Sequence, residues 1–464
     1  MTISDITQQI TNGTSVRKII EQAIDRAKRD ECNAILEVIE TRALRRADEI
    51  DRRIAAGEDI GRLGGVPFLA KDNILTFDSR TTASAHMLEN FIAPYQATVI
   101  EKLEDAGAIC IGKTNLDAFA HGGSTENSYF GPTRNIADAE RVAGGSSGGS
   151  AVAVAAGIVP FALGSDTGGS IRQPASYNGV VGLKPTYGSV SRYGVVAMAS
   201  STDVVGPIAS TVDDAQLVLD CMRGVDPHDS TTIAINSLDD KLPSPLKIGV
   251  IEQSMTDEVD PEVKSAVEHV MTFAKQQGHN VEYVSMPMQN YALAVYYIVV
   301  PAELTSNLAR FDGIKFGVAA SGHSIADVYA NTRTQGFMDE NKRRILIGNY
   351  VLSSGYYDAY YKKAQTVRTK IIDEFKEVFA HYDILISPVA PTPAFRLGEN
   401  TSDPLQMYLT DIMTVPASLA GLPAISVPAG STSAGLPIGL QVIAPMRNDG
   451  IVLKAAKELE RSNG

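Results

Sequence analysis

Two segments rich in glycine and serine contain the residues best suited to nucleophilic chemistry. The first, Gly144–Ser150, reads GGSSGGS and leads directly into a helix-forming run. The second, Gly164–Pro174, reads GSDTGGSIRQP and follows the apolar segment Val159–Leu163. Glycines beside a serine let several backbone N–H groups point to one place, as the anionic intermediate of acyl transfer requires. Ser146 and Ser170 are therefore candidate catalytic serines.

The first segment is also compatible with other interpretations. A phosphate-binding loop would need Lys-Ser or Lys-Thr after the glycines, and neither follows. The letters satisfy Gly-x-Ser-x-Gly, the nucleophile elbow of α/β-hydrolases, but the preceding 135–142 is polar and does not alternate as a strand would. An elbow also needs a later histidine, and no convincing loop motif surrounds any candidate: His228, His269, His279, His323 or His381. The elbow is the weaker interpretation, and a flexible serine-glycine turn stays open.

The second segment has two alternatives of its own. Asp-Thr-Gly is typical of aspartic proteases, but only one copy is present, and one copy cannot make their pair of carboxylates. The segment could also be an ordinary turn at the end of a strand. Ser170 stays the candidate nucleophile because two glycines stand directly before it.

A nucleophilic serine needs a base, and Lys71 is the candidate. A lysine amine can accept a proton only if burial or nearby positive charge lowers its pKa. Lys71 ends the apolar run Gly65–Ala70, so its side chain can leave a strand directly into the interior. Most lysines are surface groups, so the position alone does not decide the role.

Together, the lysine and the two serine segments resemble the amidase-signature family, whose lysine, first serine and second serine have the same separations. The resemblance implies that Ser170 is the acylating nucleophile. It makes Ser146 a bridging serine preceded by a cis peptide bond, and neutral Lys71 the base. The oxyanion hole would consist of the backbone amides of Thr167, Gly168, Gly169 and Ser170.

Two later segments, 296–313 and 342–361, resemble the glutaminase subunits of tRNA-dependent amidotransferases, and the likeness extends from about Gly64 to Pro445. It implies that Arg344 binds the α-carboxylate of glutamine, Asp411 its ammonium, and Tyr296 lines the pocket. An arginine fork suits a carboxylate and an aspartate suits an ammonium. Without the resemblance, surface ion pairs would be the ordinary alternative for Arg344 and Asp411.

The resemblance also implies partners. These are a B subunit, which binds the mischarged Glu-tRNA(Gln) or Asp-tRNA(Asn) and uses ATP and Mg²⁺, and a small C subunit that completes a heterotrimer. No cofactor is expected in this chain. The formal net charge of −13 suits that division, because tRNA affinity depends on basic side chains. Three positions depart from the family pattern, namely Ile136, Ala143 and Ser418, so a stand-alone amidase acting on a small amide is the alternative.

The elements that must position these residues alternate between strands and helices, which predicts an α/β fold. The fold class expected is a large mixed, mostly parallel sheet with helices on both faces. Helices are expected at 15–29, 42–56, 99–107, 151–156 and 262–278. Strands are expected at 66–70, 109–112, 159–163, 248–251, 281–284, 384–387, 424–427 and 440–443. The division expected is one domain, 1–464, with N-terminal helices (1–60), a catalytic core (about 64–210) and a helical substrate-specificity region (about 290–370).

Composition sets the remaining limits. The chain is 44% hydrophobic and 20% charged, and this composition predicts no membrane helix, which would need ~20 apolar residues in a row. Met1–Gly13 is polar, unlike a secretory signal, so a cytoplasmic setting is expected. Cys32, Cys110 and Cys221 form no Cys-x-x-Cys pair. We therefore expect small buried apolar cysteines and no metal site.

Overall fold

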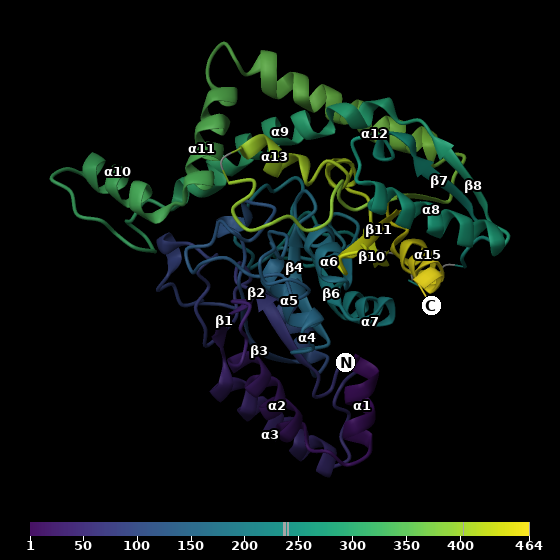
Figure 1. Ribbon diagram of the computed structural model, residues 1–464. Coiled ribbons are helices and arrows are strands. Elements are labelled where there is room, and N and C mark those ends of the chain that lie inside the picture. The colour runs from purple at the N-terminus through teal and green to yellow at the C-terminus, as the bar shows by residue number, and fades with distance from the viewer. Residues whose placement is uncertain (235–237, 239–240, 402, 464) are drawn as a thin grey trace.

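An eleven-stranded mixed sheet runs through the centre of the molecule (Figure 1). The computed structural model describes residues 1–464 apart from 235–237, 239–240, 402 and 464. The strand order is β1-β3-β2-β4-β6-β5-β10-β11-β9-β7-β8. The strands are β1 Ile35–Val38, β2 Pro67–Lys71, β3 Ile109–Thr114, β4 Phe161–Asp166, β5 Val181–Lys184, β6 Val204–Ala209, β7 Lys247–Ile251, β8 Asn280–Val284, β9 Ile384–Pro388, β10 Ala424–Ser431 and β11 Pro437–Ile443.

All eight expected strands are present, and the α/β class with a mixed sheet is confirmed. The expectation that the sheet is mostly parallel is wrong. Parallel pairs join β3, β2 and β4 near one edge and β9, β7 and β8 at the other. The run from β4 through β6, β5, β10 and β11 to β9 is antiparallel, as is β1 with β3. Alternation with helices suggested crossover connections, but β10 reaches β11 through a short turn, and a short turn permits only antiparallel pairing.

Three strands were not expected. β5 lies inside the Gly-, Ser- and Thr-rich stretch 143–206, whose composition indicates loops, and β6 begins at the end of that stretch. β1 has only four residues, all half-buried, at the edge of the sheet. Their pairing partners are distant in sequence, so local pattern carries little signal for them.

Helices cover both faces of the sheet. They are α1 Ile3–Thr11, α2 Val16–Lys28, α3 Glu40–Ala55, α4 Thr98–Asp105, α5 Gly148–Ala155, α6 Arg172–Asn178, α7 Val212–Met222, α8 Pro261–Gln276, α9 Ala292–Asn307, α10 Ile325–Gly336, α11 Asp339–Leu352, α12 Lys363–Val378, α13 Pro404–Leu409, α14 Val415–Leu419 and α15 Asp449–Glu460. Alternate residues of β2 show the two layers. Phe68 and Ala70 pack in a cluster with α4 and α7, whereas Leu69 packs with α2, α3 and α5.

The expected helices begin and end close to the predicted positions. Ser15 caps α2 through its side chain, which accepts a hydrogen bond from the backbone N–H of Lys18. After the last residue of α4 and of α8 comes one capping residue and then a glycine with positive φ. These glycines are Gly107 (φ +93°) and Gly278 (φ +89°). The helices that were not predicted are α1, α6, α7, α13, α14 and α15.

The helical region after residue 290 forms a layer of α9, α11 and α12 along one side of the molecule, and α10 projects from it (Figure 1). Contrary to the expectation from composition, the continuous helical stretch Pro287–Arg310, which includes α9, has the length and hydropathy of a membrane span. Half of the most apolar part of this stretch is buried, and α9 packs against α11, α12 and α14. Packing inside the helical layer accounts for its apolar composition.

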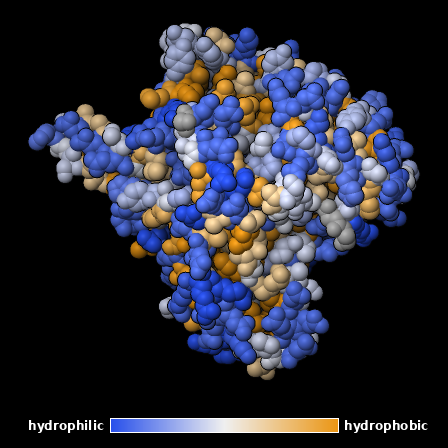
Figure 2. All heavy atoms as spheres, viewed as in Figure 1, coloured by the Kyte–Doolittle hydropathy of each residue, from blue (hydrophilic) through white to orange (hydrophobic). Residues whose placement is uncertain are grey.

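The three cysteines are free, and only Cys110 is fully buried, whereas Cys32 and Cys221 are half-buried. Within the described part of the chain, no group of three or more His, Cys, Asp or Glu residues could hold a metal ion. The face shown in Figure 2 is largely hydrophilic, and hydrophobic residues gather at its upper left, over the region of α9 and α11.

Candidate active site

Lys71 ends β2 at the centre of the site and is completely buried. Its Nζ lies 2.8 Å from Ser146 Oγ, 2.8 Å from Ser147 Oγ and 2.9 Å from Ser165 Oγ. Burial lowers the pKa of Lys71 to about 7, although the more distant carboxylates of Asp117 and Asp166 oppose the shift. Near neutral pH, a large fraction of this amine is therefore uncharged and able to accept a proton.

Ser146 stands just before α5, and the Gly145–Ser146 peptide bond is cis, as the resemblance implies. Sequence reasoning missed Ser147 and Ser165, which share the Lys71 amine with Ser146. Ser165 has a local signal, because it lies on the strand that leads into the Asp-Thr-Gly-Gly-Ser segment. Ser147 has none beyond being the neighbour of Ser146.

Ser170 lies beside the Ser146 loop, because the backbone N–H of Ser147 donates to the carbonyl of Ser170 at 3.1 Å. Ser170 is 9% exposed, whereas Lys71 and Ser146 are 0% exposed. Its hydroxyl makes no hydrogen bond with the residues that the structure describes. Of the three predicted catalytic side chains, Ser170 is thus the one that a substrate can reach.

The backbone from Thr167 to Ser170 connects β4 to α6, and none of its four N–H groups donates to an acceptor in the described chain. Gly169 has a φ of +145°, which favours glycine, and a Cβ there would lie 2.2 Å from Thr414 Oγ1. A tetrahedral oxyanion needs such unpaired, fixed N–H donors.

A buried ion pair fixes this turn at both ends. The Arg172 guanidinium donates to both carboxylate oxygens of Asp166, each at 2.9 Å, and both residues are 0% exposed. The same guanidinium donates to Ser418 Oγ at 2.8 Å. Ser418 is one of the three positions that depart from the family pattern, and its hydroxyl therefore helps to hold the ion pair in place. Thr414 Oγ1 donates to the carbonyl of Gly168 at 2.6 Å.

Tyr296 and Asp411 lie directly beside this turn. A Cβ added to Gly168 would be 2.7 Å from the Tyr296 hydroxyl, and one added to Gly169 would be 3.4 Å from Asp411 Oδ1. Asp411 Oδ1 is buried and has no hydrogen-bond partner among the described residues. Burial raises the pKa of Asp411 to about 8, because desolvation penalises the carboxylate form more than Arg344 stabilises it.

Arg344, on α11, is 3% exposed and held within an aromatic frame that the sequence did not reveal. Its Nε lies 2.7 Å from Glu340 Oε1, and its guanidinium stands over the rings of Tyr297 and Tyr408, at 5.1 and 5.5 Å from their centroids. Those rings stack on each other at 3.9 Å, and Tyr408 donates to Glu340 at 2.9 Å. The surface ion-pair alternative is wrong for Arg344, since both it and its partner Glu340 are largely buried.

A second buried carboxylate, Asp117, also escaped the sequence reasoning. It accepts hydrogen bonds from the backbone N–H groups of Thr125 (2.9 Å) and Asn127 (3.1 Å). Burial raises its pKa to about 6 against those bonds. A Cβ on Gly145 would lie 2.2 Å from its Oδ2, so Asp117 packs directly under the cis peptide.

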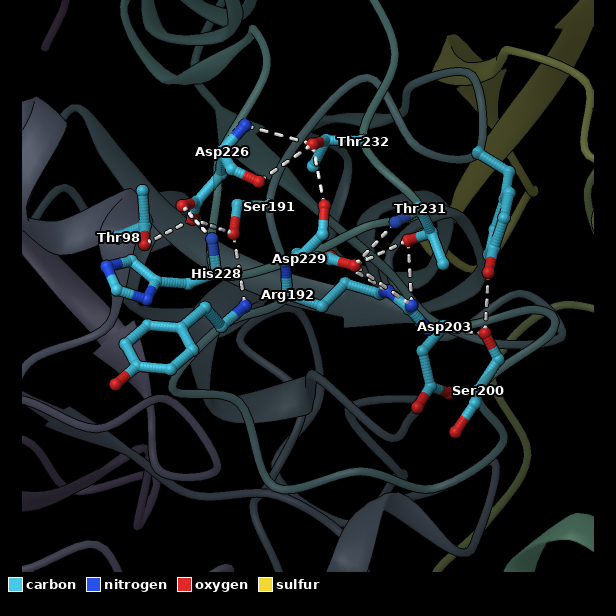
Figure 3. A network of polar contacts seen from close by, with 12 residues as sticks. Thr98, Ser191, Arg192, Ser200, Asp203, Asp226, His228, Asp229, Thr231 and Thr232 are labelled. Atoms are coloured by element: carbon cyan, nitrogen blue, oxygen red, sulfur yellow. Dashed lines mark hydrogen bonds and ion pairs between the residues drawn. The ribbon is translucent and has the colours of Figure 1, made fainter.

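A cavity of about 200 Å³ adjoins Ser165 and is also lined by Asn73, Thr167, Arg192 and His228 among others. Figure 3 shows how its outer wall is held. Asp229 accepts from the Arg192 guanidinium and from Thr231, and Asp226 accepts from Thr98 Oγ1 (2.6 Å) and Ser191 Oγ (2.5 Å). These carboxylates stabilise the two loops that enclose the cavity.

The arrangement is suited to acyl transfer, with an accessible serine, a buried proton acceptor and a row of unpaired N–H donors. The chain belongs to the amidase family, which matches residues 18–453.

Among similar proteins, the A subunit of the glutamyl-tRNA(Gln) amidotransferase of Thermosynechococcus vestitus is 51% identical over 98% of this chain and 96% of its own length. The same subunit of Geobacillus thermodenitrificans is 51% identical over 93% and 90%. The crystal structure of this subunit from Thermotoga maritima has a TM-score of 0.83 at 42% identity, over 100% of this chain and 95% of that one. An amidase of solved structure has a TM-score of 0.86 at 29% identity, covering 100% of both chains.

Proposed function

We propose that the chain is the glutamine-hydrolysing A subunit of a glutamyl-tRNA(Gln) amidotransferase. The observation that carries the proposal is the contact of Asp411 and Tyr296 with the 167–170 turn, so that the glutamine-binding candidates adjoin the candidate nucleophile. Full-length similarity to several such subunits supports it. Asp-tRNA(Asn) is a second acceptor that this subunit type would serve.

In the proposed reaction, Ser170 Oγ attacks the side-chain amide carbon of glutamine while its proton passes through Ser146 to the Lys71 amine. The oxyanion accepts hydrogen bonds from the amides of the 167–170 turn. Collapse of the intermediate breaks the C–N bond, and the departing nitrogen takes the proton and leaves as ammonia. Water then hydrolyses the acyl-Ser170 ester by the same proton route.

The pocket charges fit glutamine held at both ends. Arg344 supplies a fixed cation for the α-carboxylate, and Glu340 with the two stacked tyrosines holds its guanidinium in place. Asp411 supplies an unpaired carboxylate oxygen for the ammonium. The helical region of about 290–370, which carries Tyr296 and Arg344, is in this proposal the substrate-specificity part of a single 1–464 domain.

The proposal includes partners of stated roles in the cytoplasm. A B subunit would bind the mischarged tRNA and use ATP and Mg²⁺ to activate it, and a C subunit would complete the heterotrimer. This chain would hold no cofactor. Its −13 charge supports the assignment of tRNA binding to another subunit.

The test separates the two serines by their chemistry. The Ser170→Ala variant is expected to release no ammonia from glutamine and to form no acyl-enzyme. The Ser146→Ala variant is expected to acylate slowly, because Ser146 relays protons and does not attack. Mass spectrometry of the intact chain after mixing with glutamine, with partner subunits present, follows both reactions. Covalent labelling at Ser146 with none at Ser170 would reverse the roles.

The alternative is a stand-alone amidase, which the family membership allows. Arg344→Ala and Asp411→Ala are expected to lower kcat/KM for glutamine strongly and to spare hydrolysis of a plain aliphatic amide such as butanamide. Removing either charge leaves a buried substrate ion without a partner, at a cost of about 2–5 kcal/mol. Unchanged glutamine kinetics in both variants would favour the stand-alone amidase.

A further inference from the structure

Two buried polar atoms near Arg344 have no hydrogen-bond partner among the residues the structure describes. One is Asp411 Oδ1, which the proposed function assigns to the substrate ammonium. The other is Nε2 of His121, a residue that is 0% exposed. Buried polar atoms without partners are rare in folded proteins, and such an atom at a binding site indicates a ligand.

The hydrogen bonds of Asn341 determine which nitrogen of His121 carries the proton. Asn341 Oδ1 accepts from the backbone N–H of Met338 at 3.1 Å, which orients the side-chain amide. Its Nδ2 then donates to the carbonyl of Ala118 at 2.8 Å and to His121 Nδ1 at 2.7 Å. Since Nδ1 is an acceptor, the proton of the neutral ring lies on Nε2. His121 therefore presents an unused N–H donor.

The ring lies on the same side of α11 as Arg344. Asn341, its partner, precedes Arg344 by three residues, and side chains at that spacing share a helix face. Burial lowers the pKa of His121 well below its usual value, so the imidazole ring is neutral. The positive charge of Arg344 lowers this pKa further, because the guanidinium is close to the ring. Gly123 follows His121 by two residues, and a Cβ added to Gly123 would be 3.8 Å from Asp411 Oδ1. The segment that carries His121 therefore also adjoins Asp411.

One terminal nitrogen of the Arg344 guanidinium is free to bind a ligand. Its Nε is engaged by Glu340, and its Nη2 reaches the Tyr297 hydroxyl only at 3.5 Å. Its Nη1 has no hydrogen bond within the described chain. A carboxylate has two oxygens, and binding through one donor would leave the second oxygen desolvated and unpaired.

We propose that His121 is a second carboxylate-binding residue of the glutamine site, donating from Nε2 to one oxygen of the α-carboxylate while Arg344 binds the other. This inference rests on the proposed function. It assigns His121 to substrate specificity, with Asn341 as the positioning residue that sets its tautomer.

The experiment uses three amides that differ only in their charged groups. Glutamine has both the carboxylate and the ammonium, glutaramate has only the carboxylate, and 4-aminobutanamide has only the ammonium. Ammonia release is measured with the full chain in the assembled complex. For His121→Leu, we expect kcat/KM to fall about 10- to 100-fold for glutamine and glutaramate, as for loss of a hydrogen bond to a charged group. The value for 4-aminobutanamide should stay unchanged.

Two further variants keep the test independent of folding. In His121→Gln, the longer side chain can place an N–H near the position of Nε2, so partial recovery of glutaramate hydrolysis is expected. The shorter His121→Asn should not recover it. The ratio of kcat/KM for glutaramate to that for 4-aminobutanamide does not depend on the fraction of folded enzyme. His269→Leu, on the exposed face of α8, is the matched control and should leave the ratio unchanged.

Equal losses on all three amides in His121→Leu and His121→Asn would overturn the inference and leave His121 a structural residue. An unchanged ratio in both would also overturn it, since Nε2 would then meet only water. The proposed function is tested separately by the Arg344→Ala and Asp411→Ala variants. Unchanged glutamine kinetics in both of these variants would contradict the proposed function, whether or not His121 contributes.

Discussion

Lys71 and Lys113 show how two fully buried lysines can differ in chemistry. Lys113 Nζ lies 3.0 Å from a carboxylate oxygen of Asp72, whereas every hydrogen bond that Lys71 Nζ makes in the described chain ends on a serine oxygen. A lysine without a carboxylate in contact gains little compensation for desolvation. Lys71 is thus the one suited to act as a base.

The protonation of Lys71 predicts the pH dependence of hydrolysis. The pKa of Lys71 is about 7, so at a pH below this value the amine is charged and cannot accept a proton. The kcat/KM for an uncharged amide should therefore rise as the pH increases through about 7. The Lys71→Ala variant should lose most activity. Lys71→Arg should not restore it, because guanidinium stays protonated. Rates with butanamide from pH 5.5 to 9 test this, and an active Lys71→Arg enzyme would contradict the role of base.

Asp411 predicts a separate pH effect on binding. With a pKa raised to about 8 by burial, this carboxyl is mostly protonated at neutral pH when the pocket is empty. Binding of the glutamine ammonium then requires loss of that proton, so the KM for glutamine should fall as pH rises from about 6 to about 8. Glutaramate, which has no ammonium, should not show this trend, and neither should Asp411→Asn with glutamine. Calorimetry in buffers of different ionisation enthalpy would detect the released proton.

At the scale of elements, the site depends on the turn that joins β4 to α6. The Asp166–Arg172 pair holds both ends of the turn, and Thr414, Tyr296 and Asp411 fill the space beside its two glycines. The amides of the turn therefore stay unpaired without being free to move, which preorganises them for an oxyanion.

The substitution Gly169→Ala tests this preorganisation. The new Cβ would lie 2.2 Å from Thr414 Oγ1 in a backbone conformation with positive φ, so the turn must shift. We expect kcat to fall at least about 100-fold, the scale for loss of one oxyanion donor. Gly157→Ala is the matched control, since Gly157 also has positive φ (+67°) but nothing within 4 Å of the Cβ position. Gly157→Ala should cost stability alone, about 1–3 kcal/mol by thermal unfolding. Equal kcat in the two variants would contradict the prediction.

At the scale of the whole molecule, α11 joins the buried site to the surface. Its inner face carries Arg344 and Asn341, and its outer face exposes Leu346 (69% exposed) and Tyr350 (48%). Large exposed apolar side chains gathered in one region are typical of protein interfaces.

If this surface contacts the proposed partner subunits, Leu346→Glu should weaken their co-purification with this chain. Placing a charge in an apolar contact costs solvation free energy that no partner group offsets. Ile54→Glu is the control, because Ile54 is also exposed (39%) but lies on α3, at the opposite end of the molecule in Figure 1. Co-purification from the native host, with mass spectrometry of the associated chains, measures the effect. Full retention of partners by Leu346→Glu would place the interface elsewhere.

The sequence by itself determined the chemistry-bearing segments and most of the sheet. Hydrophobic periodicity and glycine placement are local signals, so eight strands and five of the helices around them could be read directly. The order and separations of Lys71, Ser146 and Ser170 were also visible through the family resemblance, and the glycines that precede each serine are its sequence neighbours.

Only the tertiary structure decided which distant residues meet. The antiparallel centre depends on β5 and β6, whose partners are fixed by packing and not by local pattern. The Arg172 contact with Ser418 spans 246 positions, and the Asn341 contact with His121 spans 220. No periodicity links such pairs, since each side chain alone is compatible with many environments and its partner is set by how the layers close over one another. The pocket that accompanies the catalytic residues is therefore a property of the folded chain.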